Sequence, residues 1–137
     1  MSFEKESIDK LSEVISLYND EVNANVSCMY IFMYNDESQF MMASAYKVGD
    51  RVAGNLDAGV SDEKDDEIYD LICGEIFPEL EEIYQKYNMP MPVEFRIVYN
   101  TVSGAFDCDY RYEKDLEDDY NCGITAQHWL DSFKADC

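Results

Sequence analysis

The sequence is poor in positive charge. Of its 137 residues only 10 are Lys or Arg, against 30 Asp or Glu, which gives a formal net charge of −20 at pH 7. Binding to nucleic-acid phosphates depends on Lys and Arg side chains that displace counterions. The balance therefore argues against direct binding to DNA, RNA or anionic membranes, and it predicts a cationic partner whose approach the negative field accelerates.

Long apolar runs are also missing. No stretch approaches the roughly 18 apolar residues that cross a membrane, and the first 14 residues lack the apolar core of a signal peptide. We therefore expect a cytoplasmic protein that makes no membrane contact. The cysteines are odd in number, far apart and without a CxxC pair, a pattern typical of reduced thiols rather than of a disulfide framework or a zinc site. They are Cys28, Cys73, Cys108, Cys122 and Cys137.

Motifs of catalysis and of cofactor binding are scarce. The only histidine is His128, and no spacing selects a cysteine or carboxylate to work with it. Nucleotide-binding loops and the HExxH zinc motif are missing. Asp107 and Asp109 lie two apart on a predicted strand and could share a cation such as Ca²⁺, but the EF-hand pattern is absent. We expect no enzyme, no cofactor and no metal site, with a small enzyme using His128 as an alternative.

Three stretches have helical periodicity. Apolar residues recur at steps of three and four over residues 4–22, which predicts an amphipathic N-terminal helix. A longer stripe over residues 61–87 predicts a central helix capped by Ser61 or Asp62. Residues 125–134 form a short C-terminal helix in this interpretation.

Proline interrupts the central helix. Pro78 lies within the apolar stripe, where it removes one backbone hydrogen bond and clashes with the preceding turn. The stripe continues on both sides of it and includes Ile76. We therefore expect the helix to be kinked near Ile76 and Phe77 rather than ended.

The remaining patterns predict strands. Residues 26–34 and 39–48 read as a hairpin with a well-buried first strand, and residues 51–56 as a short third strand. Residues 93–99 and 106–112 alternate between apolar and charged side chains and predict a second hairpin. No repeat or linker divides residues 1–137, so we expect one domain. The order α-β-β-(β)-α-β-β-α predicts an α+β fold with a mostly antiparallel sheet of four to five strands.

The negative charge gathers in two clusters. Residues 62–70 contain six acids and one Lys, and residues 107–119 contain seven acids against Arg111 and Lys114. A solvated surface would explain one such cluster, but solubility needs a net charge of only about 2 to 8. Because self-repulsion also destabilises the compact state, we infer that a partner uses this charge.

The clusters and a neighbouring aromatic side chain supply the candidate partner-binding residues. Tyrosine is favoured at interfaces because it covers much area at little cost in rotamer entropy. The candidates are Asp62, Glu63, Asp65 and Asp66 of the first cluster, Asp107, Asp109, Glu113, Asp115, Glu117, Asp118 and Asp119 of the second, and Tyr120 beside it.

One family shares this layout. Residues 92–99 (PVEFRIVY), followed by residues 104–110 (GAFDCDY) and a tail with Trp129, resemble the YezG-like antitoxins, which are immunity proteins of bacterial polymorphic toxin systems. The sequence departs from that pattern in the Gly-rich residues 49–60 and in its Cys-ending tail. The resemblance implies a cytosolic α+β protein that binds and inhibits a toxin, several such toxins being nucleases.

The implied mechanism agrees with the charge. A nuclease needs a basic cleft for phosphates, so an acidic surface could cover that cleft sterically and electrostatically. A nucleic-acid mimic that inhibits a DNA-binding protein is the alternative within the binding class. The sequence leaves open the identity of the toxin, the cluster that contacts it and the oligomeric state.

Overall fold

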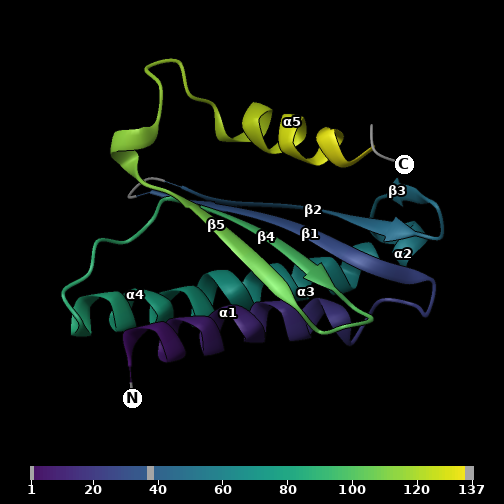
Figure 1. The fold of residues 1–137 in the computed structure, drawn as a ribbon, viewed down its shortest axis with the longest axis horizontal. Helices are drawn as coiled ribbons and strands as arrows, with labels where there is room; N and C mark the ends of the chain where they lie inside the picture. Colours follow the sequence, from purple (N-terminus) through teal and green to yellow (C-terminus); the bar gives the residue numbers. More distant parts are fainter. Residues whose placement is uncertain (1, 37–38, 135–137) are drawn as a thin grey trace. The chain divides into compact units, whose positions relative to one another are not determined.

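The computed structural model describes residues 2–36 and 39–134. Glu37 and Ser38, part of the predicted turn of the first hairpin, and Cys137 lie outside the described residues. The chain divides into two compact units (Figure 1): a helical unit, Met1–Val22 with Val60–Met91, and a sheet unit, Asn23–Gly59 with Pro92–Cys137. The single domain over residues 1–137 stays a prediction.

The helical unit places the N-terminal helix beside the central one. Its elements are α1 (Phe3–Asn19), α3 (Asp62–Leu71), the π turn η1 (Ile72–Ile76) and α4 (Phe77–Lys86). The hydroxyl oxygen of Ser61 accepts a hydrogen bond from the backbone N–H of Lys64 at 3.1 Å, which confirms the predicted cap. α1 packs against η1 and α4.

The irregularity near Pro78 is a π turn. Ile72 is buried, the next buried position is Phe77, and Leu80 follows. A π turn takes one extra residue, so the buried position advances by five instead of four. The prediction that Ile76 belongs to the buried stripe is therefore wrong, since Phe77 takes that place and Ile76 is only half-buried. Pro78 follows as the second residue of α4, where its missing N–H is tolerated.

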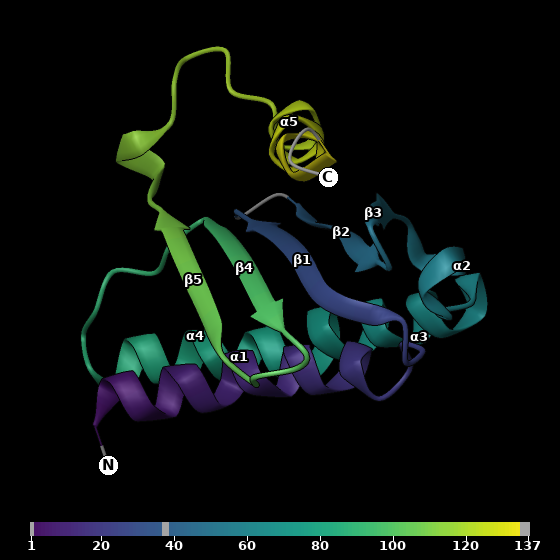
Figure 2. The ribbon, with the colours of Figure 1, turned by 45° about the vertical axis from the view of Figure 1, so that its right-hand side comes forward.

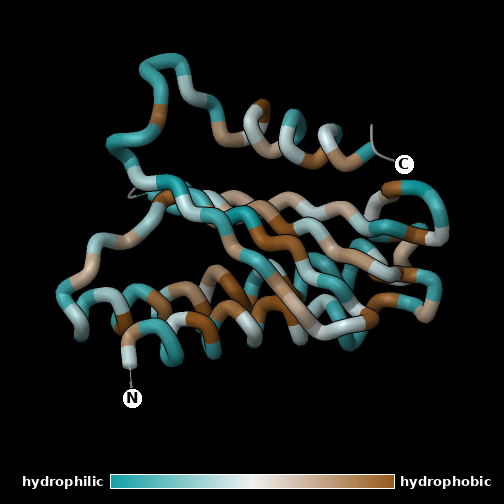
Figure 3. The backbone as a smooth tube through the Cα atoms, in the orientation of Figure 1, coloured by the Kyte–Doolittle hydropathy of each residue, from teal (hydrophilic) through white to brown (hydrophobic). Residues whose placement is uncertain are grey.

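The sheet unit contains five antiparallel strands in the order β3-β2-β1-β4-β5. This confirms the predicted α+β class and the antiparallel sheet, including the well-buried first strand. The strands are β1 (Val26–Asn35), β2 (Phe40–Val48), β3 (Arg51–Ala53), β4 (Glu94–Asn100) and β5 (Phe106–Arg111). Figure 3 shows hydrophobic and hydrophilic residues interspersed along β4 and β5.

The third strand is shorter than predicted. It ends at Ala53, whereas the pattern over residues 51–56 suggested three more residues. Gly54 precedes a short helix, α2 (Asn55–Ala58), and Gly59 ends that helix at a φ of 95°. Because this left-handed conformation suits glycine, the Gly-rich stretch turns the chain instead of extending the sheet.

The C-terminal helix α5 (Cys122–Lys134) lies over β1 and β2 (Figures 1 and 2). The ring of Phe133 stacks on Tyr30 with centroids 4.0 Å apart, and Trp129 packs against Phe32. α5 begins three residues before the predicted start. Within the described residues, none of the helices has both the length and the hydropathy that a bilayer crossing requires.

Candidate partner-binding site

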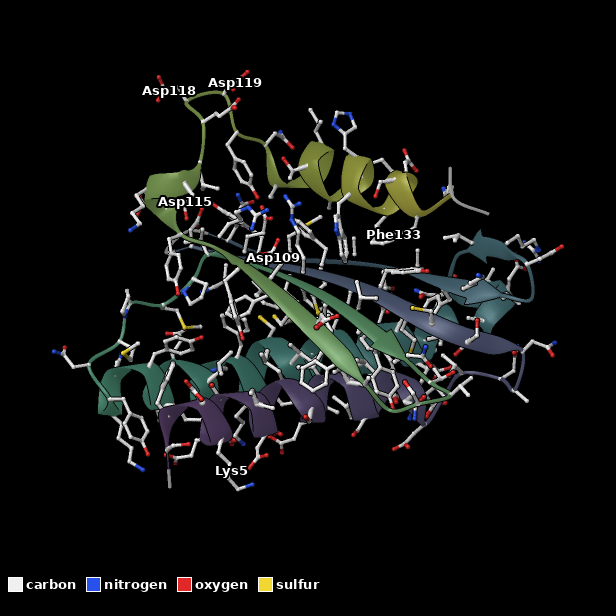
Figure 4. All side chains as sticks on the ribbon, viewed as in Figure 1. Lys5, Asp109, Asp115, Asp118, Asp119 and Phe133 are labelled. Atoms are coloured by element: carbon white, nitrogen blue, oxygen red, sulfur yellow. The ribbon has the colours of Figure 1, made fainter. Side chains whose placement is uncertain are left out.

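The acidic loop, residues 113–119, connects β5 to α5 and contains five of the seven acids of the second cluster. The side chains of all five acids in it are exposed. Figure 4 shows Asp118 and Asp119 at the tip of the loop, directed away from the sheet, with Asp115 closer to β5. The remaining two acids are Glu113 and Glu117. The loop thus exposes a group of negative charges to solvent.

Backbone and apolar contacts hold the acidic loop in place. Its first residues form a 3-10 turn, η2 (Glu113–Asp115), in which the backbone N–H of Tyr112 donates to the Asp115 carboxylate at 3.0 Å. Leu116 packs into the apolar cluster beneath α5. After the loop, the amide oxygen of Asn121 accepts from the backbone N–H of Ile124 at 3.0 Å and caps α5. This cap accounts for the early start of α5.

A hydrogen-bond network around the buried Glu94 also holds the end of the acidic loop in place. The Tyr120 hydroxyl donates to Glu94 Oε2 at 2.6 Å, and Arg96 Nε donates to the same carboxylate in an ion pair. Glu94 has an exposed fraction of 0%. Burial raises the pKa of Tyr120, and its hydrogen bond to Glu94 raises it further, so the phenol keeps the proton that it donates.

Tyr120 is less accessible than the exposed acids predicted to bind a partner. Its ring packs against Tyr34 with centroids 5.5 Å apart, and the residue is half-buried. Sequence reasoning placed Tyr120 among the residues that contact a partner. In the structure its hydroxyl is already used within the protein, so its visible role is to position the acidic loop.

The two acids on β5 lie on the face of the sheet that carries Arg96 and Glu94. Asp107 and Asp109 are both exposed. Asp109 faces Arg96 across the strand pair and forms an ion pair with Arg111 at 2.8 Å between Oδ2 and Nη1. Because a cation lies beside it, the charge of Asp109 is partly compensated, unlike the charges at the tip of the acidic loop.

A pocket of about 460 Å³ lies beneath the acidic loop. Two of the three arginines and the only histidine of the sequence line this pocket. Its lining includes Glu94, Arg96, Arg111, Asp115, Glu117, Asp119, Tyr120 and His128. Sequence reasoning missed this pocket, although the charged pair Glu94 and Arg96 on an otherwise apolar strand was a signal that the face is not simply solvated.

His128 is exposed and lines this pocket. Among the described residues, no hydrogen bond joins His128 to a cysteine thiol. Cys28, Cys73, Cys108 and Cys122 are not in disulfide bonds in this part of the chain. Burial raises the pKa of Cys108 to about 12, so this thiol stays protonated. Within residues 2–36 and 39–134, no group of three or more His, Cys, Asp or Glu is placed to hold a metal ion.

The first acidic cluster belongs to the other unit. Asp62, Glu63 and Asp66 are exposed on α3 of the helical unit. Asp65 is half-buried and accepts a hydrogen bond from the Tyr18 hydroxyl at 3.2 Å. Asp65 therefore takes part in the packing of α1 with α3 and is the least available of the four candidates.

Replacement of Asp65 by Asn is expected to stabilise the protein at neutral pH. Burial raises the pKa of the Asp65 carboxyl, and the charges of Asp66 and Asp62 raise it further, while the Tyr18 hydrogen bond lowers it. The pKa of Asp65 is therefore higher in the folded state than in the unfolded state. Ionisation of Asp65 lowers the free energy of unfolding at pH values above the folded-state pKa, and this loss disappears at pH values below the unfolded-state pKa.

We expect Asp65→Asn to raise the free energy of unfolding by less than about 1 kcal/mol at pH 7, the site being partly screened by solvent. The gain should vanish towards pH 3, below the ordinary carboxyl pKa of 3.8. Urea unfolding across this range measures it, with the exposed Asp70→Asn as the control, since Asp70 is not among the charges that raise the pKa of Asp65. A gain that does not change with pH would contradict the assignment.

In comparisons with known proteins, no protein-family model matches the sequence and no curated protein matches it significantly.

Proposed function

We propose that this protein is an immunity protein that binds and neutralises a cognate basic toxin domain, with a nuclease as the leading class. The observation that carries the proposal is the acidic loop, which exposes five carboxylates while Leu116 and the neighbouring Tyr120 anchor it to the sheet unit. An anchored loop loses little conformational entropy on binding, so more of its interaction energy remains as affinity.

The charges of the loop are available to a partner. Among the described residues, Glu117, Asp118 and Asp119 form no ion pair, and Lys114 is the only base in the loop. Uncompensated exposed carboxylates of one sign attract a cationic surface over the Debye length, about 8 Å at physiological salt. They therefore accelerate the encounter with a basic protein and leave neutral proteins unaffected.

The same geometry supports a mechanism of inhibition. A nuclease must concentrate Lys and Arg where it holds phosphates. A protruding acidic loop can occupy such a cleft and exclude the substrate both by its volume and by its charge. The resemblance to YezG-like antitoxins supports this proposal independently of the loop geometry.

The test begins with the isolation of the partner. The tagged protein is used to capture proteins from its source cells at low salt, and each captured basic protein is then expressed alone and together with this chain. The proposal expects a protein that arrests growth when expressed alone and is harmless in co-expression. A captured DNA-binding protein without toxicity would instead favour the nucleic-acid mimic, and the capture of no basic protein would contradict both.

A further inference from the structure

The helical unit contains a second candidate surface, a groove of about 420 Å³ between α1 and η1. Its floor is apolar and consists of Leu17, Leu71 and Ile76. Leu71 is 40% exposed, so part of this apolar floor is open to solvent. The volume falls within the range of about 300 to 1,000 Å³ that is typical of binding pockets.

The π turn explains why this floor is apolar. The extra residue of η1 brings Phe77 into the buried stripe and leaves Ile76 at its margin, next to Leu71. On the opposite side of the groove, α1 presents Ser12 and Ser16, which are too small to fill the space. π turns within α-helices are often found at functional sites, since their cost in hydrogen-bond geometry has to be offset by another gain.

Carboxylates surround the apolar floor. Asp9, Glu13 and Glu75 line the groove, and Glu75 forms no ion pair among the described residues. Asp9 forms an ion pair with Lys5 at 3.5 Å and Glu13 forms one with Lys10 at 2.9 Å. Exposed pairs of this kind contribute roughly 0–1 kcal/mol, so a partner's cation can replace them.

We propose that this groove binds a positively charged amphipathic helix of a partner protein. Apolar side chains on one face of that helix would enter between α1 and η1, and Lys or Arg at its margins would meet Asp9, Glu13 and Glu75. A second copy of this chain fits poorly, because two molecules of charge −20 repel each other. The inference goes beyond the proposed function, which rests on the acidic loop of the sheet unit.

A synthetic peptide of leucine and lysine in helical spacing serves as the probe. The full-length protein is titrated with this peptide and with a scrambled peptide of the same composition, which keeps the charge but loses the apolar face. We expect the amphipathic peptide to bind at least tenfold more tightly and to shift the NMR amide signals of groove residues. Leu71→Ser combined with Glu75→Gln should weaken its binding by about tenfold.

The control variant removes an apolar side chain and a carboxylate elsewhere in the helical unit. Met89 is 46% exposed and Glu63 is exposed, so Met89→Ser combined with Glu63→Gln matches the groove variant in both respects. Circular dichroism checks that both variants fold. Equal binding of the scrambled peptide, or equal weakening by the two variants, would overturn the inference. Amide shifts confined to the acidic loop would also overturn it while leaving the proposed function intact.

Discussion

Replacement of Arg96 by Met is expected to lower the free energy of unfolding by about 3–5 kcal/mol, because it leaves the carboxylate of Glu94 buried without its ion-pair partner. The Glu94 side chain is 1% exposed and that of Arg96 is 21% exposed, so water cannot fully replace the lost guanidinium. Tyr120 still donates one hydrogen bond to the carboxylate, but a neutral donor does not balance the charge. Urea unfolding followed by circular dichroism measures the loss.

A double variant separates the loss of the ion pair from the loss of packing. Glu94→Gln added to Arg96→Met removes the buried charge together with its partner, and much of the stability should return. The matched control is Arg51→Met, which breaks the exposed Arg51–Asp57 pair and should cost less than about 1 kcal/mol. If Arg96→Met costs no more than Arg51→Met, the network does not hold the acidic loop as described.

Charge reversal at the tip of the acidic loop is expected to slow association with the cognate basic domain by at least about tenfold at low salt. The variant carries Lys in place of Glu117, Asp118 and Asp119, which are exposed and form no ion pair among the described residues. Exposed charges act mainly on the encounter, so the dissociation rate should change much less. Stopped-flow measurements over a range of salt concentrations check both rates.

The control has the same change in net charge at a different site. Lys in place of Asp62, Glu63 and Asp66 alters three exposed acids of α3 in the helical unit. We expect this variant to slow association much less than the loop variant does. Equal slowing by both variants would mean that the net charge attracts the partner and that the acidic loop has no special role.

Local pattern was enough to predict most of the fold. The alternation over residues 93–99 and 106–112 and the cap at Ser61 depend on neighbours within a few positions, and the structure confirms them. The errors occur where two local signals compete. Gly54 overrode the strand pattern over residues 51–56. The π turn next to Pro78 shifted the buried position from Ile76 to Phe77.

The candidate site was predictable only in part. The acids of residues 113–119 are visible in the sequence because a run of charges near turn residues is exposed in nearly any fold. The roles of Tyr120 and Glu94 were not visible, since they are 26 positions apart and meet only when the chain after β5 returns over β4. The pocket that contains Arg96, Arg111 and His128 was not visible for the same reason, since its residues come from separate elements of the chain.

By itself the sequence determined the net charge and the α+β class, because these follow from composition and from short-range periodicity. The tertiary structure alone decided which acids stay free in solvent, which are bound to a neighbour, and where apolar side chains remain uncovered. The physical reason is that burial and ion pairing depend on residues far apart in the chain. A local sequence pattern therefore does not reveal those contacts.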